Sequence, residues 1–279
     1  MKPNVINFHI TDKCNYHCKY CFAKFHQQDL PLEDAKRVVD SVRNYFAANG
    51  IENGRINIAG GEPMLYPHLE EIIRYIKSKE MAVSIITNGS RLTSDFCERV
   101  GGLLDMVGIS IDAANKEGNE RVGRCCRGAT PDFTELKKAV DVLHANDVKL
   151  KINTVVSKLN LNEDMASVYE LLQPDKVKLV CVHKVENING GMGDLIPTFE
   201  EYVDFVQRNG AIKNCRVVLE GPGYMQNAYF MINPQGEVFM NERGEEKKYG
   251  SCLKRPLTEI FESMPLDIEK YFERYVEKR

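Results

Sequence analysis

Residues 5–22 read VINFHITDKCNYHCKYCF, and this stretch indicates both the fold and the chemistry of the chain. Val5–Thr11 alternates apolar with polar side chains, as a β-strand with two different faces does. Three cysteines follow at once with the spacing Cys14-x3-Cys18-x2-Cys21. The chain therefore opens with a strand that leads directly into a cysteine-rich loop.

The same strand pattern returns five times along the chain. Strands are predicted at 55–59, 82–87, 106–111, 148–156 and 177–182, and helices between them at 32–49, 69–79, 93–100, 133–145 and 162–172. Repeated βα units imply parallel strands joined by right-handed crossovers. Six units are fewer than the eight of a closed barrel. The predicted fold class is therefore α/β, a partial (β/α)6 TIM-like barrel.

The last hundred residues have a different pattern. They contain a Gly/Asn-rich loop at 187–193, a helix at 198–208, a hairpin of 229–232 with 237–240, and helices at 257–261 and 268–276. We expect residues 1–185 to form the partial barrel and residues 186–279 a C-terminal extension that caps it, in one structural unit.

The composition describes an ordinary globular protein. Hydrophobic residues make up 43% of the 279 residues, charged residues 28%, and the net charge is −3. This charge argues against a partner that is a nucleic acid. No signal peptide and no apolar run of about 20 residues is present. We expect a cytoplasmic protein without membrane contact, whose nine cysteines are reduced or bound to metal.

Several predicted strands carry polar side chains on one face. Asn7, Asn57 and Asn153 lie on such faces, together with the cations Arg55, Lys151, Lys176 and Lys178. In a barrel these faces line the interior, which predicts a cavity for an anionic ligand. The alternative is that each strand is an edge strand with one solvated face.

The spacing of Cys14, Cys18 and Cys21 is typical of a metal site. Three thiolates on a short loop can hold a four-iron cluster and leave one iron open to another ligand. Zinc is the alternative, with His9, His17 or His26 as a fourth ligand. The loop follows the first strand, at the end of a barrel where active sites lie.

These motifs resemble the radical S-adenosylmethionine (SAM) superfamily. An aromatic residue precedes the third cysteine, and the sequence Gly60-Gly61-Glu62-Pro63 follows the second strand as the GGEP motif of that superfamily does. The resemblance implies a [4Fe-4S] cluster on the three cysteines and SAM chelated to the open iron. It implies SAM contacts by Gly60, Gly61 and Glu62, and at the next two strand ends by Asn88 and Ser110.

A closer resemblance is to the viperin family. The segments that carry this resemblance are residues 7–11 and 14–22, Ile56-Asn57, residues 84–90, Gly123-Arg124, Lys151-Ile152-Asn153, residues 162–165 and Lys178. This resemblance implies dehydration of a nucleoside triphosphate to its 3′-deoxy-3′,4′-didehydro form, an antiviral chain terminator. A 5′-deoxyadenosyl radical takes the ribose C4′ hydrogen, and the 3′-hydroxyl leaves as water. CTP is the favoured substrate, with UTP and GTP open.

The viperin resemblance also implies roles for particular residues. Arg55, Lys151, Lys176 and Lys178 would bind phosphate, Arg124 would lie near SAM or phosphate, and Asn7, Asn57 and Asn153 would contact ribose or base. Tyr229 would donate the final hydrogen. The chain departs from animal viperins at Ala59, where they have serine, and at Arg55, where they have lysine. Cys125 and Cys126 have no assigned role.

Two other functions are compatible with the motifs. One is a different radical SAM reaction on another substrate, and the other is a non-catalytic iron–sulfur protein that senses redox state or binds a partner. For the enzyme we expect a monomer that receives electrons from an external donor of the flavodoxin or ferredoxin type.

Overall fold

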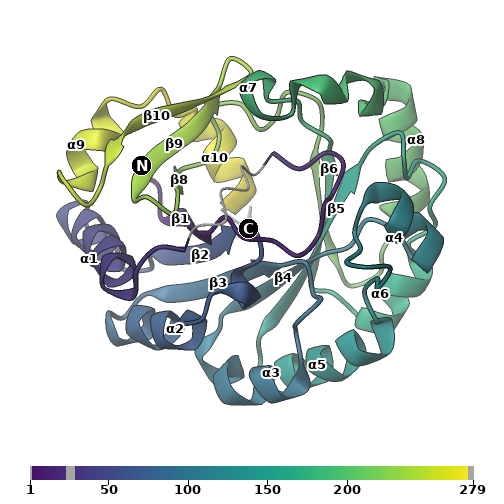
Figure 1. The fold of residues 1–279 in the computed structure, drawn as a ribbon, viewed down its shortest axis with the longest axis horizontal. Helices are drawn as coiled ribbons and strands as arrows, with labels where there is room; N and C mark the ends of the chain where they lie inside the picture. Colours follow the sequence, from purple (N-terminus) through teal and green to yellow (C-terminus); the bar gives the residue numbers. More distant parts are fainter. Residues whose placement is uncertain (1, 23–28, 276–279) are drawn as a thin grey trace. The chain divides into compact units, whose positions relative to one another are not determined.

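The computed structural model describes residues 2–22 and 29–275 (Figure 1). The chain divides into two compact units. Unit 1 contains Met1–Cys14, Ala23–Ile85 and Tyr224–Arg279, and unit 2 contains Asn15–Phe22 and Ile86–Gly223. Unit 1 thus joins the N-terminal and C-terminal segments. The division predicted at residues 185 and 186 remains a prediction.

Unit 1 is built on strands in the order β10-β9-β8-β1-β2-β3. β1, β2 and β3 are parallel, β8 is parallel to β1, and β9 and β10 are antiparallel to their neighbours. The strands are β1 (Val5–Thr11), β2 (Arg55–Gly60), β3 (Ala82–Thr87), β8 (Met231–Ile232), β9 (Glu237–Glu242) and β10 (Glu245–Ser251). The predicted C-terminal hairpin is confirmed as β8 and β9, although its first strand begins only at Met231, so Tyr229 precedes it.

Unit 2 is built on the parallel strands β4-β5-β6-β7. These are β4 (Met106–Ser110), β5 (Lys149–Val156), β6 (Lys176–Cys181) and β7 (Arg216–Glu220). The sequence analysis missed β7, because charged residues at both of its ends leave only three apolar residues between them. All six strands predicted for residues 5–182 are confirmed within one or two residues, as is the α/β class.

Helices separate the strands as the periodicity predicts. Unit 1 contains α1 (Leu32–Ala48), α2 (Leu69–Ser78), α9 (Leu257–Glu262) and α10 (Ile268–Tyr275). Unit 2 contains α3 (Ser94–Val100), α4 (Lys116–Val122), α5 (Phe133–Ala145), α6 (Ala166–Leu172), α7 (Glu186–Asn189) and α8 (Phe199–Asn209). Short 3-10 turns occupy Pro63–Leu65, Gly101–Leu103 and Gly190–Leu195.

Two predictions about the helices are wrong. The segment 187–193 is not a simple loop, because α7 and the 3-10 turn Gly190–Leu195 occupy it. The Asn189 side-chain oxygen accepts a hydrogen bond from the Val185 backbone at 2.7 Å, which stabilises a turn that intrinsic propensity would not. The helix predicted from residue 162 begins only at Ala166, because the chain first turns at Asn160, whose carbonyl accepts from Glu163 N.

The two faces of the strands differ as the sequence predicts. In unit 2, Ile109, Leu150, Ile152, Val177 and Leu179 are fully buried, and Figure 1 shows α3, α5 and α6 along one side of these strands. Lys151, Asn153 and Lys176 alternate with them and are only partly buried. The apolar face therefore forms the core, and the polar face is the candidate for the ligand-binding site.

Over residues 2–22 and 29–275, no helix combines the length and the apolar character that crossing a bilayer requires.

Candidate active site

The three cysteines of the motif all lie in the described part of the chain, where none of them is in a disulfide bond, and each is of intermediate exposure. Cys14 ends the first segment of unit 1, and Cys18 and Cys21 belong to the segment Asn15–Phe22 of unit 2. Among the described residues, no three His, Cys, Asp or Glu side chains are grouped as a bound metal ion requires. The donor set itself, three thiols in a C-x3-C-x2-C segment, fits a [4Fe-4S] cluster with one iron left open.

The segment Asn15–Phe22, which we call the cluster loop, is fixed in unit 2 by the end of α4. His17 N donates to Gly123 O at 3.2 Å, and Lys19 N donates to Val122 O at 3.1 Å. Gly123 has a φ of 82°, and a Cβ added there would lie 2.3 Å from His17 O. Glycine at position 123 therefore allows the two backbones to approach, both by its conformation and by its lack of a side chain.

Replacing Gly123 with alanine is therefore expected to lower the free energy of unfolding by about 2–5 kcal/mol, from the left-handed backbone and the steric overlap together. Gly128 is a matched control, since its φ is 79° and an added Cβ would meet nothing within 4 Å. Gly128→Ala should lower the free energy of unfolding by only about 1–2 kcal/mol. Urea denaturation of the cluster-free proteins measures both, and equal losses would contradict the close approach of Gly123 to the cluster loop.

A buried polar network holds the side chains next to the cluster loop. The Tyr20 hydroxyl donates to Asp112 Oδ2, and Arg124 Nε donates to the same carboxylate oxygen. The other carboxylate oxygen accepts from Val155 N at 2.6 Å. Asp112 is 0% exposed, Tyr20 5% and Arg124 6%. One carboxylate thus connects the cluster loop with strand β5 and with the predicted SAM residue Arg124.

The electrostatics of this network follow from its burial. Desolvation opposes the charge on Arg124, but the adjacent Asp112 carboxylate outweighs it and raises the pKa of the guanidinium. Desolvation together with Asp112 raises the pKa of the Tyr20 hydroxyl. Burial also raises the pKa of the Cys18 thiol, against the opposing influence of Arg124. Arg124 therefore stays charged and Tyr20 stays neutral at physiological pH.

The cluster loop is also held by apolar contacts and by a hydrogen bond from Asn189. Tyr20 packs with Val122, Val182 and Met192 in a buried cluster that Cys18 also contacts. Asn189 Nδ2 donates to Tyr20 O at 3.2 Å. The segment that was expected to be a loop is therefore part of the support for the cluster loop.

The predicted SAM residues of unit 1 pack against the chain just before Cys14. Gly61 N donates to Thr11 O at 2.8 Å, and Glu62 N donates to Lys13 O at 2.7 Å. A Cβ on Gly60 or Gly61 would lie 2.2 Å from a carbonyl oxygen of this segment. The glycine pair is required for this approach. Glu62 is 0% exposed, and its Oε1 accepts from Met64 N at 2.9 Å, so it also caps the following turn.

The predicted SAM residues of unit 2 lie at the carboxyl ends of strands. Asn88 Nδ2 donates to Asn15 Oδ1 at 2.9 Å, which connects the end of β3 with the cluster loop. Ser110 ends β4 and lies in register with Asn153 on β5. The SAM-contacting roles of these residues remain predictions.

The polar residues of unit 2 form rows across its strands. Ser110, Asn153 and Lys178 make one row, and Lys151 and Lys176 lie in register in the row below. Residues in register on parallel strands point to the same face. Lys178 Nζ lies 2.5 Å from Glu220 Oε1, and Glu220 is 0% exposed. The sequence analysis missed Glu220, because the strand that carries it was not predicted.

The polar residues of unit 1 form a second row. Ser84 Oγ donates to Asn57 Oδ1 at 2.8 Å, and Asn57 Nδ2 donates to Asn7 Oδ1 at 2.7 Å. Asn7 Nδ2 donates to the Tyr275 hydroxyl at 3.2 Å. The rings of Tyr275 and Tyr229 pack edge to face, with their centroids 6.5 Å apart. Tyr229 is therefore connected through Tyr275 with the row of asparagines.

Arg55 begins β2 opposite Val5 on β1. Its Nε is buried and has no hydrogen-bond partner among the described residues. A buried guanidinium nitrogen without a protein acceptor is unusual, which is compatible with a ligand as its partner.

The histidines named as alternative zinc ligands do not share one unit. His9 lies in unit 1, where burial lowers its pKa to about 4 and its ring packs on Phe239, and His17 is exposed in unit 2. His26 lies outside the described residues. Cys125 and Cys126 precede a tight turn, in which Arg127 and Gly128 have positive φ and Cys126 pairs with Ala129.

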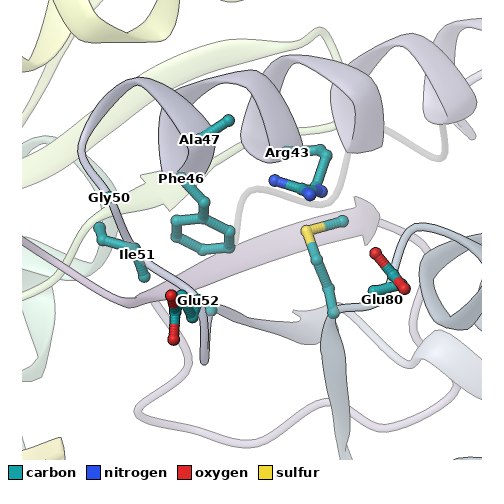
Figure 2. A pocket seen from close by; sticks show the side chains of 9 residues that line it. Arg43, Phe46, Ala47, Gly50, Ile51, Glu52 and Glu80 are labelled. Atoms are coloured by element: carbon teal, nitrogen blue, oxygen red, sulfur yellow. The ribbon is translucent and has the colours of Figure 1, made fainter.

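A cavity of about 350 Å³ in unit 1 has a lining that includes none of the predicted site residues (Figure 2). Arg43, Phe46, Glu52 and Glu80 are among its lining residues. The segments that form it precede β2 and β3, at the strand ends opposite the glycine pair. Active sites of parallel α/β folds lie at the carboxyl ends, so this cavity is not the candidate site.

Comparisons with known proteins agree with this geometry. The radical SAM superfamily matches residues 8–172. A Flammeovirga pacifica protein named S-adenosylmethionine-dependent nucleotide dehydratase is 31% identical over 96% of this chain and 93% of its own length. The nucleotide dehydratase RSAD2 of Oncorhynchus mykiss is 27% identical over 98% of the chain and 79% of its own length.

The fold has solved counterparts as well. The structure of Streptococcus suis SuiB bound to S-adenosylmethionine superposes with a TM-score of 0.68 at 15% identity, over 98% of this chain and 67% of SuiB. At this identity the likeness shows the fold alone. Together with the superfamily match and the sequence relatives, it shows that the chain belongs to the radical SAM superfamily and, within it, to the S-adenosylmethionine-dependent nucleotide dehydratases, the viperin family.

Proposed function

We propose that the protein dehydrates a nucleoside triphosphate to its 3′-deoxy-3′,4′-didehydro analogue, with CTP as the favoured substrate and UTP or GTP as the alternatives. The names of the relatives support a nucleotide substrate and a dehydration. The antiviral use of the product follows from the viperin resemblance.

Enzymes of this superfamily use a [4Fe-4S] cluster and SAM, and the thiols of Cys14, Cys18 and Cys21 fit that cluster. When bound, the two cofactors supply the 5′-deoxyadenosyl radical that takes the C4′ hydrogen of the ribose. The residues of the chain have the other tasks, which are to hold the cluster loop, to orient SAM and to bind the triphosphate.

One observation carries the choice of substrate: the polar face of the unit 2 strands carries a group of cations. Ser110, Asn153 and Lys178 share one row, and Lys151 and Lys176 share the next. Successive rows on one face of a strand are about 6–7 Å apart. A ligand on this face with its phosphates on the lysines would thus keep its other end near the strand ends that meet the cluster loop.

The remaining proposed contacts lie in unit 1. Arg55, with its unpartnered buried Nε, would bind phosphate, and Asn7 and Asn57 would contact ribose or base. Tyr229 would donate the final hydrogen. After the C4′ hydrogen atom and the 3′-hydroxide have left, the product is one electron short of its C3′=C4′ double bond, and the hydroxide needs one proton to become water. The hydrogen atom of Tyr229 would supply this electron and this proton, and an external donor of the flavodoxin or ferredoxin type would then return an electron to Tyr229, with a proton from the solvent.

The test is anaerobic reconstitution of the cluster, followed by addition of SAM and dithionite with CTP, UTP or GTP in turn. We expect one triphosphate to raise 5′-deoxyadenosine well above the level without nucleotide. The same reaction should yield a product lighter than the substrate by one water, in equal amount to the 5′-deoxyadenosine. Liquid chromatography with mass spectrometry measures both compounds.

The outcomes separate this proposal from the other functions. Cleavage of SAM that no triphosphate stimulates would contradict nucleotide dehydration and favour another radical SAM reaction. A reconstituted cluster without any SAM cleavage would favour the non-catalytic iron–sulfur protein. The corresponding nucleoside monophosphates serve as controls, since they lack the β- and γ-phosphate groups and therefore most of the charge that the lysines would bind.

A further inference from the structure

Strand β7 adds a third cation to the lower polar row of unit 2. Lys151 on β5 lies in register with Lys176 on β6, and Lys176 lies in register with Arg216 on β7. Neighbouring strands are about 4.8 Å apart, and residues in register on parallel strands point to the same face. We propose that Arg216 binds a phosphate group of the substrate beside Lys151 and Lys176. This inference rests on the proposed function, since it assigns a further contact in the same site.

β7 brings both a carboxylate and a cation to this face. Glu220, which is fully buried, lies 2.5 Å from Lys178. The row below contains the cationic side chains Lys151, Lys176 and Arg216, each of intermediate exposure. Three cationic groups in one row suit a ligand that carries several negative charges.

The orientation of β7 argues against a purely solvated role for Arg216. β7 is the last strand of its sheet, and edge strands often carry charges that prevent pairing with other chains. However, Leu219 is 47% exposed on the opposite face, while Arg216 and Glu220 point to the face of Lys176 and Lys178. The charged side chains of β7 therefore lie toward the site, and an apolar side chain faces the solvent.

The chemistry of arginine suits this position. A guanidinium offers paired N–H donors that match two oxygens of one phosphate group, which an ammonium does not. Arg216 would thus add affinity and recognition of a chain of phosphates rather than of a single one.

The experiment compares binding of CTP, UTP and GTP, and of their monophosphates, to the reconstituted holoenzyme and to its Arg216→Gln and Arg216→Lys variants. Arg216→Gln should raise the Kd of the preferred triphosphate about tenfold, as the loss of one charged hydrogen-bonding group does. The Kd of the monophosphate should change less than about threefold, because a single phosphate needs fewer of the three cations. Arg216→Lys should recover part of the loss.

Arg99→Gln is the matched control, because Arg99 is exposed on α3 in the same unit. If the wild-type protein binds no triphosphate, the proposed function itself fails. If the wild type binds one and Arg216→Gln binds it as tightly as Arg99→Gln does, the role of Arg216 is wrong while the proposed function stands. Equal losses of triphosphate and monophosphate binding, with a lower urea midpoint, would make Arg216 structural and would also overturn the inference.

Discussion

Replacing Cys18 by alanine should abolish reductive cleavage of SAM. The substitution removes one of three thiolates available to a four-iron cluster, and no other protein thiolate is in the motif. Loss of a residue that only supports a metal ligand typically lowers metal affinity or activity by about 10–100-fold. Loss of a ligand itself should therefore reduce the rate of SAM cleavage by more than about 100-fold. Iron and sulfide content after reconstitution and the rate of 5′-deoxyadenosine formation measure the effect.

Cys126→Ala is the matched control for this prediction. Cys126 is a free thiol of similar exposure in unit 2, but it lies outside the motif. We expect it to leave cluster content and SAM cleavage unchanged. A Cys18→Ala protein that retains full cluster content and activity would show that the cluster is held by other residues. Urea denaturation of the cluster-free variants excludes unfolding as the cause of a loss.

The largest expected effect on stability is that of Asp112→Ala. The substitution leaves the buried guanidinium of Arg124 without its carboxylate and removes the acceptor of the Tyr20 hydroxyl and of Val155 N. Breaking a buried ion pair by removing one partner costs about 3–5 kcal/mol, because an uncompensated charge remains. Urea denaturation of the cluster-free protein should show a loss of this size. SAM affinity should fall as well, since Arg124 and the cluster loop lose a common support.

Two further variants sharpen this prediction. Asp141→Ala removes an exposed carboxylate on α5 that pairs with Lys137, and should change the unfolding free energy by less than about 1 kcal/mol. The double variant Asp112→Ala, Arg124→Met also removes the buried guanidinium charge that Asp112→Ala leaves without a carboxylate. It should recover part of the stability that Asp112→Ala loses. A single Asp112→Ala variant as stable as Asp141→Ala would contradict the network.

The sequence alone was sufficient for the features that depend on local pattern. The alternation in Val5–Thr11 and the apolar spacing of α1, whose Ala35, Val38 and Val42 are fully buried, determine strand and helix because burial follows their periods. The cysteine spacing and the glycine pair determine the kind of cofactor, because both motifs are short and their function needs residues adjacent in the chain. The family followed from these motifs together.

Some elements could not be predicted because no local pattern specifies them. β7 has too few apolar residues to be recognised, and it becomes a strand by pairing with β6. α4 has glycine within it, and it is stabilised by the Asn115 side chain, which accepts from Gly118 N at 2.8 Å. α7 depends in the same way on Asn189.

The residues of the candidate site show the same division. The sequence by itself named the candidate residues, from the cluster cysteines to Lys151, Lys176 and Lys178, because the cysteines form a local motif and alternation on a strand assigns each side chain to a face. Only the tertiary structure decided which of them are neighbours. Register across β5, β6 and β7 places Arg216 beside Lys176, and packing brings Tyr20 and Arg124 to Asp112 from segments far apart in the chain. Such pairings depend on burial and hydrogen bonding between distant segments, and a linear pattern does not contain that information.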